Sequence, residues 1–437
     1  MDFMTQAQKK PVLSTRFGHV GLAFLMFLPV LGEFGRIFIG PFNGIIASDI
    51  IIPPFLIIWF FLFFTGPHQR LNKIPERIWL PLLLFIAIAF LSLLRSLLFL
   101  DNSEVISGSL YLIRFIQYAL LYFVTLSSIQ TYKQKETLIK FMVISALLIA
   151  IAGFIQLQIF PDLQELEAEG YDPHINRLVS TWLDPNFVGG FFAIIISVLT
   201  GIFLYKKSLK QKITLAIIIA ILAVALFLTF SRSAYLALIA GLFVITILKS
   251  RKLLVAITIL CVLGLAVSER AQERTAELIT SISSVLTTNA VENPDPTARL
   301  RIQNWQQTWY LIEKRPLLGS GYNNLRSVNY REGFVTDTEI HSASGSDSSL
   351  LTIFATTGVF GLITYLWIIF LALKHSFFGW RDSKSKPASK GLSLGILGAT
   401  TSILIHSLFV NSLLFAPILI YLWPLFAIAE STHFKKY

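Results

Sequence analysis

Charge is what this sequence lacks most. Only 14% of its 437 residues are Asp, Glu, Lys or Arg, while 54% are hydrophobic. Soluble domains carry about 25% charged residues. A charge content this low, combined with apolar runs of about 20 residues, excludes an ordinary soluble enzyme and predicts an all-α polytopic membrane protein.

Cysteine and metal-binding patterns are also scarce. The single cysteine, Cys261, lies within an apolar segment, so no intrachain disulfide can form. The sequence holds no Cys–His cluster and no D-x-D motif, and the GSG at 319–321 is not followed by a phosphate-loop lysine. We therefore expect no metal site and no cofactor.

Apolar runs long enough to cross a membrane recur along the chain. A helix of about 20 residues spans the hydrocarbon core. By that measure the sequence predicts about twelve transmembrane helices, at 17–33, 48–65, 78–99, 107–128, 138–160, 187–205, 213–230, 233–248, 253–267, 348–373, 391–408 and 412–430.

The positions of Lys and Arg predict the orientation of these spans. Short cytoplasmic loops are enriched in cations. With a cytoplasmic N-terminus, the cations concentrate in the inner segments, and the short outer loops keep only Arg36, Arg177 and Arg232. Both termini are then cytoplasmic, with no cleavable signal peptide. The net charge of +11 is mostly a topology signal and gives no reason to expect nucleic-acid binding.

Two outer segments hold most of the remaining polar residues. Residues 161–186 form an acidic loop, and 268–347 form a long outer loop that we expect to fold, because long structureless loops are rare. A helix is expected near 298–314 of this loop, with an apolar stripe of Leu300, Trp305, Trp309 and Ile312. The predicted organisation is spans 1–5 in 1–160, an outer loop at 161–186, spans 6–9 in 187–267, the large outer loop at 268–347, and spans 10–12 with the tail in 348–437.

Arg232 is the hardest of the outer arginines to explain as a bland surface residue. It stands in TFSRSAYLAL (229–238), at a tight turn between two predicted spans, where an unpaired charge costs several kcal/mol. The alternative is a side chain that reaches out to lipid phosphates. Arginine forks bind phosphate oxygens through paired hydrogen bonds, so arginines converging here would suit a lipid-linked diphosphate. For five others we prefer a solvated surface: Arg270, Arg274, Arg315, Arg326 and Arg331.

A general base is the second requirement of transfer chemistry. In HSASGSDSSLL (341–351), His341 and Asp347 precede the tenth predicted span. Either side chain could accept a proton from an acceptor hydroxyl. Their spacing does not decide whether both face one site, and an exposed loop residue is the alternative for His341.

Four stretches resemble the O-antigen ligase and polymerase family, outer-face glycosyltransferases that use undecaprenyl-diphosphate-linked glycans. TFSRSAYLAL is similar to the family's T-x-S-R-x-A turn, and RLVSTWLDPNFVGGFFA (177–193) to its Arg-led segment ending in Pro-Asn before a span. RLRIQNWQQTWYLIEKRPLLGSGYNNL (299–325) resembles its R-x-x-x-W helix with the following Pro-x-x-Gly-x-Gly. DSSLLTIFATTGVFGL (347–362) resembles the opening of the span after the large loop. The order of these motifs is more specific than any one of them.

The resemblance implies roles for the matching arginines. Arg232 matches the arginine that engages the donor diphosphate. Arg301, on the helix with Trp305, best matches the second essential arginine, with Arg299 as the competing register. Arg177 leads its segment and is a further candidate for binding the diphosphate.

The resemblance also bears on the base. Family ligases carry a histidine at a set distance before the Gly that opens GVFG, and counting back from Gly358 gives Asp347 rather than His341. Either Asp347 replaces the histidine or His341 reaches the same place from a longer loop. This departure favours a polymerase or another branch of the family over a ligase.

The function implied is a membrane glycosyltransferase that moves a glycan from an undecaprenyl-diphosphate donor to an acceptor hydroxyl. The resemblance implies a GT-C-like fold, a metal-independent inverting transfer, and a place in the bacterial plasma (inner) membrane with the active site on the outer face. The acceptor could be a glycan, a lipid A core or a protein, the last making the enzyme a protein O-oligosaccharyltransferase. The alternative is a transporter or flippase of lipid-linked sugars, which would need charges along a midplane path. Within the spans, Arg95 and Arg114 are the clear candidates for such a path.

Overall fold

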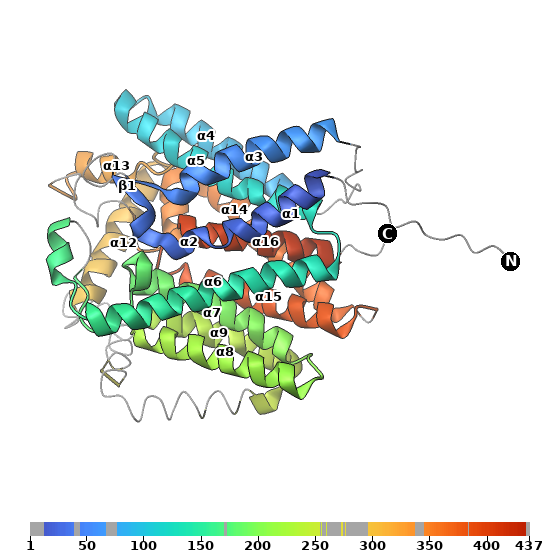
Figure 1. Cartoon of the computed structure of the whole chain (residues 1–437). Coiled ribbons are helices and arrows are strands. Elements are labelled where there is room, and N and C mark those ends of the chain that lie inside the picture. The colour runs from blue at the N-terminus through green and yellow to red at the C-terminus, as the bar shows by residue number, and fades with distance from the viewer. Residues whose placement is uncertain are drawn as a thin grey trace.

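Helices dominate the part of the chain that the computed structural model describes, residues 13–38, 44–66, 77–169, 173–253, 255, 259, 272–273, 276, 296–336, 345–382 and 384–433. Most long helices run in roughly parallel directions and form one bundle (Figure 1). They are α1 (Leu13–Leu25), α3 (Ala47–Thr65), α4 (Trp79–Ser96), α5 (Asn102–Ser128), α6 (Tyr132–Ile159), α7 (Pro185–Phe203), α8 (Leu209–Leu228), α9 (Arg232–Lys249), α14 (Ser349–Arg381), α15 (Pro387–His406) and α16 (Ala416–His433).

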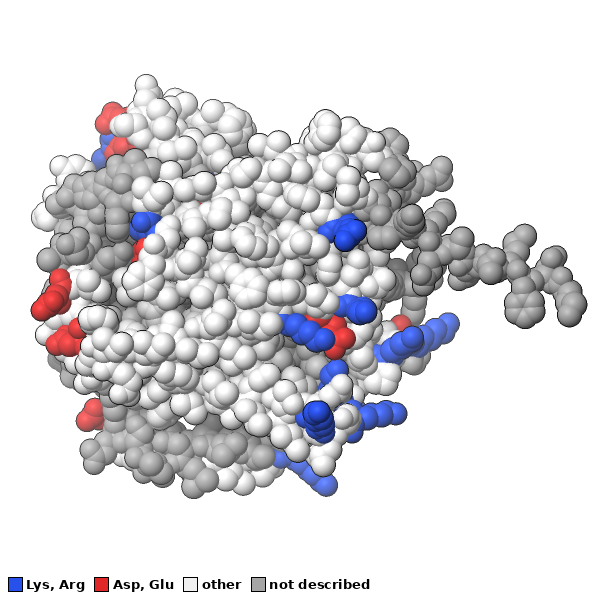
Figure 2. Space-filling view, in the orientation of Figure 1, with Lys and Arg blue, Asp and Glu red and all other residues white. Residues whose placement is uncertain are grey.

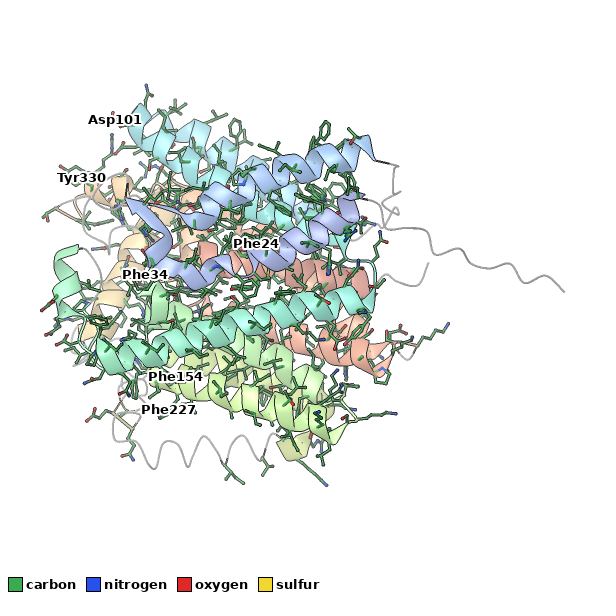
Figure 3. All side chains as sticks on the ribbon, viewed as in Figure 1. Phe24, Phe34, Asp101, Phe154, Phe227 and Tyr330 are labelled. Carbon is green, nitrogen blue, oxygen red and sulfur yellow. The ribbon has the colours of Figure 1, made fainter. Side chains whose placement is uncertain are left out.

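The other described elements connect these helices. They are α2 (Leu28–Leu31), η1 (Gly32–Gly35), β1 (Arg36–Phe38), β2 (Gly44–Ile46), η2 (Gln164–Glu169), η3 (Ser180–Trp182), α12 (Pro296–Lys314) and α13 (Leu325–Arg331). In Figure 1, α12, α13 and β1 all lie at the left end of the bundle. Figure 3 places Asp101, Phe34 and Tyr330 toward that same end.

The prediction of an all-α polytopic membrane protein is confirmed. Ten helical segments among the described residues are long and apolar enough to cross a membrane, from Leu13–Gly35 to Pro387–His406. α16 largely coincides with the predicted twelfth span at 412–430, but its last turn, from Glu430 to His433, is polar. The predicted span at 253–267 lies almost wholly outside the described residues. The total number of spans therefore stays a prediction.

Among the ten candidate spans, α7 is the most enclosed. Asp184 caps its N-terminus, where the Asp184 Oδ1 accepts a hydrogen bond from the Asn186 backbone N–H at 2.7 Å, and a proline occupies the first helical position. Its remaining surface packs against α15, α9 and α8. A Cβ on Gly201 would lie 2.2 Å from the Gly395 backbone nitrogen, so the backbones of α7 and α15 touch. α7 and α15 therefore form a closely packed central pair.

α14 is kinked toward the end of the bundle that carries α12 and α13. Gly358 has φ +70°, outside helical geometry, and a Cβ there would lie 2.1 Å from the Leu317 carbonyl oxygen. The kink exposes carbonyls that the 315–321 loop satisfies: the Ser320 N–H donates to the Ala355 carbonyl at 2.8 Å. The GSG at 319–321 therefore belongs to a loop that is hydrogen-bonded to α14 at its bend.

A two-stranded antiparallel ladder was not predicted by the sequence. β1 and β2 pair Arg36 with Ile46 and Phe38 with Gly44. Arg114 of α5 holds this ladder, because its Nη2 donates to the Gly44 carbonyl oxygen at 2.8 Å. The ladder connects the first two transmembrane segments at the end that carries α12 and α13.

The helix predicted near 298–314 is confirmed as α12, but its apolar stripe is wrong in part. Ile312 is buried at 3% exposure, whereas Leu300 and Trp309 remain 62% and 51% exposed. Leu311, which the stripe omitted, is fully buried. The inward face is therefore narrower than the pattern suggested, and an apolar part of α12 stays open.

Charged side chains divide between the two ends of the bundle. On the face shown in Figure 2, most Lys and Arg lie toward the right end, and most Asp and Glu toward the left. The broad middle of this face carries neither sign over most of its area. An uncharged belt between two charged ends is the expected surface of a membrane-spanning bundle.

Candidate active site

A cavity of about 950 Å³ lies at the end that carries α12 and α13. Its walls come from the α2–η1 segment, the start of α3, α5, the 173–187 segment, α12, α13, and the segments before α14 and α16. Arg177, Arg301 and Asp347, three of the residues predicted from the sequence, line it together. They come from three separate parts of the chain, so only the tertiary structure joins them.

Two other predicted residues, Arg232 and Arg299, lie elsewhere. Arg299 is exposed and Arg232 is half-buried, and neither lines the cavity. Between the two registers considered on α12, the structure therefore places Arg301 at the cavity and Arg299 outside it. His341 lies outside the described residues.

Asp347 is held in an unusual backbone conformation. Its φ is +52°, in the left-handed region that non-glycine residues seldom adopt. Ser346 and Ser348 on either side are buried, and the Ser346 Oγ donates to the Ser348 carbonyl at 2.9 Å. Asp347 itself is exposed. The chain thus forces this carboxylate outward between two anchored serines, and such local strain concentrates at functional sites.

The segment before α14 is tied to both neighbouring walls. The Asn304 Nδ2 donates to the Gly345 carbonyl at 3.1 Å, and the Thr352 Oγ1 donates to the Asn411 Oδ1 at 2.9 Å. Asn304 lies about one turn from Arg301 on α12. The segment that carries Asp347 is therefore hydrogen-bonded to the helix that carries Arg301.

Arg177 is bound to the turn that contains the TFSR motif. Its Nε donates to the Thr229 carbonyl at 2.9 Å and its Nη2 to the Phe230 carbonyl at 3.4 Å. Phe230 has φ +49°, in the left-handed region, where the chain turns between α8 and α9. Arg177 thus links two of the sequence motifs while also lining the cavity.

Arg232 begins α9 directly after this turn. Ser231 caps the helix, and its Oγ also donates to the Asn186 Oδ1 at 2.7 Å. Ser233 lies within 3.4 Å of the Nε2 of His406, a fully buried side chain. The conspicuous motif around Arg232 therefore packs α7, α9 and α15 together beside the cavity.

Several cavity residues were missed by the sequence reasoning. His174, Asp184 and Arg326 line the cavity, although the sequence analysis assigned Arg326 to a solvated surface. Arg36 and Glu33 pair with each other at the wall formed by the first span. The clustering of arginines along 299–331 was the available signal for Arg326, but periodicity could not tell which of them faces inward.

Arg114 and Arg95, the candidates for a transport path, both have structural partners. The Arg114 Nη2 lies 2.6 Å from the Asp49 Oδ2, and its Nε donates to the Asp49 Oδ1 at 3.1 Å. The Arg95 Nη1 donates to the Gly319 carbonyl at 3.2 Å. Arg114 also lines the cavity. These bonds secure β2, α3 and the 315–321 loop.

Five arginines and three carboxylates line the cavity. Such a set binds a polyanion such as a diphosphate through charge-assisted hydrogen bonds, and an adjacent carboxylate can accept a proton. Across the described residues there is no group of three His, Cys, Asp or Glu side chains that could hold a metal ion.

Comparison with known proteins addresses the family. Residues 215–366, from α8 to the middle of α14, match the family described as O-antigen ligase. No curated protein matches the chain. The matched segment contains the TFSR turn, α12 with Arg301, and Asp347, so the match confirms, over these residues, the chain's resemblance to the O-antigen ligase and polymerase family.

Proposed function

We propose that this protein is a membrane glycosyltransferase that moves a glycan from an undecaprenyl-diphosphate donor to an acceptor hydroxyl. The observation that carries the proposal is that Arg301, Arg177 and Asp347 line one cavity, although they lie far apart in sequence. The family match supports glycan ligation at a membrane in general terms. The cavity's arginines suit a diphosphate, and its carboxylate suits an incoming hydroxyl.

In the proposed reaction, Asp347 accepts the proton of the acceptor hydroxyl. The acceptor oxygen attacks the anomeric carbon of the donor sugar as the bond between that carbon and the diphosphate oxygen breaks. The electron pair of this bond leaves with the lipid diphosphate, whose added charge Arg301, Arg326 and Arg177 stabilise. A single displacement of this kind inverts the anomeric configuration. His341 is the alternative base.

Arg232 and Arg299 have smaller parts in this proposal. Arg232 lies beside the turn to which Arg177 binds, so we propose that it adds positive potential and holds that turn rather than contacting the diphosphate first. Arg299 lies on the exposed side of α12, where it can attract the anionic donor before the donor enters.

The proposed orientation rests on charge. Cations gather at the end of the bundle opposite the cavity (Figure 2). By the positive-inside rule, that end is cytoplasmic and the cavity opens on the outer face of a bacterial plasma membrane. α1 begins and α16 ends at the cation-rich end (Figure 1), which supports cytoplasmic termini.

The test is a transfer assay with the full-length protein in lipid and a defined undecaprenyl-diphosphate oligosaccharide. Wild type is expected to transfer the glycan, and Arg301→Ala to lose roughly two to three orders of magnitude in rate. Arg331→Ala is the matched control, since Arg331 pairs with Asp101 and Glu104 at 2.7 Å outside the cavity. Products that grow in repeat units identify a polymerase, and a single addition identifies a ligase.

The acceptor is tested in the same assay by supplying a lipid A core, a polysaccharide or a hydroxyl-bearing protein in turn. The proposal fails if no acceptor receives sugar from wild type. It fails in favour of a transporter or flippase if the same preparation instead moves the lipid-linked glycan across vesicles.

A further inference from the structure

α12 carries a second hollow, separate from the cavity. This open hollow has a volume of about 530 Å³. Its lining residues are Ile302, Trp305, Gln306, Trp309, Tyr310, Glu313 and Leu351. Trp309, which is exposed on α12, is therefore part of a concave surface.

The chemistry of this hollow is apolar. Most of its lining is aromatic or aliphatic, and only Gln306 and Glu313 are polar. The Glu313 Oε1 already accepts a hydrogen bond from the Trp309 Nε1 at 2.8 Å, and this bond orients the indole. A sugar site requires several free donors and acceptors beside its aromatic rings, whereas a hydrocarbon chain requires only apolar faces. The hollow therefore fits a hydrocarbon better than a glycan.

The hollow adjoins the arginine-lined cavity. Trp305 lines the hollow and Phe409 lines the cavity, and their ring centroids are 6.3 Å apart. Leu351 lines the hollow, while the next residue, Thr352, lines the cavity. A thin strip of side chains thus separates an apolar surface from a cationic one.

One helix contributes to both sides of this strip. Arg301 lies in the cavity, and Trp305 and Trp309 follow it in the hollow at intervals of about one turn. A molecule that satisfies both must have an anionic head and an apolar tail joined at a short distance. Tryptophan is also enriched where proteins meet the membrane interface.

We propose that the α12 hollow binds the first isoprene units of the lipid donor while the diphosphate head occupies the cavity beside Arg301. The inference rests on the proposed function for the identity of the head. Trp309 is the principal tail contact, held by Glu313 and by an edge-to-face contact with Phe354 whose ring centroid lies 6.3 Å away. Trp309 thus acts as a residue that selects lipid-linked over free diphosphates.

The test compares two ligands of the same head group. Full-length protein in lipid nanodiscs is titrated with farnesyl diphosphate and with inorganic diphosphate, and empty nanodiscs correct for partitioning of the prenyl chain. Wild type is expected to bind farnesyl diphosphate at least roughly tenfold more tightly, since several buried CH₂ groups each add to affinity. In Trp309→Ala this preference falls roughly fivefold, and affinity for inorganic diphosphate stays unchanged.

Trp367→Ala is the matched control, because Trp367 is a 39% exposed tryptophan of α14 that lines neither space. Its preference for farnesyl diphosphate should equal that of wild type.

Equal weakening of both ligands by Trp309→Ala would overturn the inference, since Trp309 would then only support α12. An unaltered preference in Trp309→Ala would overturn it as well, and the proposed function would survive. If an unlinked oligosaccharide protects Trp309 from a soluble quencher, the hollow is a glycan surface. If neither diphosphate binds wild type, the proposed function fails with it.

Discussion

Charged side chains have different surroundings at the two ends of the bundle. At the cation-rich end, Glu430 is only 2% exposed and has three protein partners. The Tyr122 hydroxyl donates to its Oε2 at 2.6 Å, the Ile78 N–H donates to the same oxygen at 3.1 Å, and Arg77 lies 3.8 Å from its Oε1. At the opposite end, Arg301 and Asp347 line a cavity large enough for part of a substrate.

This difference separates a structural charge from a functional one. Burying an ion is costly unless its hydrogen-bonding capacity is satisfied, and satisfied groups leave nothing for a ligand. Lys135 follows the same rule at the cation-rich end, where its buried Nζ donates to the Thr432 Oγ1 at 2.6 Å. Arg301 and Asp347 instead line an open cavity, where a substrate that enters can reach them. Substitutions at the two ends should therefore affect different quantities.

The largest effect is expected at Asp347. In Asp347→Asn the side chain keeps its shape but cannot accept a proton, so the transfer rate should fall by roughly two to four orders of magnitude. The unfolding temperature should not change, because the side chain is exposed. The rate is measured with radiolabelled donor, and His341→Ala is run beside it. Full activity in Asp347→Asn, with loss in His341→Ala, would transfer the role of base to His341.

At the cation-rich end the effect should fall on stability instead. Glu430→Ala leaves the Tyr122 hydroxyl and the Ile78 N–H buried without their shared acceptor, and should lower the free energy of unfolding by roughly 3 kcal/mol. Denaturant unfolding in detergent measures this loss, with the conservative Glu430→Gln expected to lose less. Transfer per folded molecule should equal that of wild type. A transfer defect in well-folded Glu430→Gln would break the distinction between the two ends.

Arg177 both binds the protein framework and lines the cavity, so its variants test the difference between structural charges and charges at the cavity. Arg177→Ala removes two hydrogen bonds to the carbonyls of Thr229 and Phe230, and should cost about 1–2 kcal/mol of stability. It should also slow transfer, because the residue lines the cavity. Arg177→Lys retains the charge but loses the planar fork. Recovery of transfer without recovery of stability in Arg177→Lys would assign the catalytic effect to charge alone.

The smallest effect is expected at Lys314. Its hydrogen bond with Glu332 raises the pKa of the ammonium above the ordinary lysine value, so the group stays protonated throughout the neutral range. Exposed pairs of this kind are screened by water and salt. Lys314→Ala should change neither the unfolding midpoint nor the transfer rate between pH 6 and 8. A clear loss of transfer would place the outer part of α12 in the site.

The sequence by itself predicted the ten candidate spans that the structure describes, because an apolar run and its flanking cations are local properties of the chain. It also predicted α12, and the order of its motifs named Asp347 and Arg301 as candidate site residues. It could not choose between Arg299 and Arg301. Residues two positions apart on a helix point in directions that differ by about 200°. Only the packing of α12 decides which of these directions faces the cavity.

Other features depended wholly on contacts between distant segments. Arg326 faces the cavity because α13 packs beside α14, and the β1–β2 ladder is held by Arg114 of α5. Glu430 is saturated by partners whose positions along the chain give no hint of contact. Whether a charged side chain is satisfied or available depends on what surrounds it in space. The sequence could therefore name the charges of this protein, and only the tertiary structure could assign them to its framework or to its site.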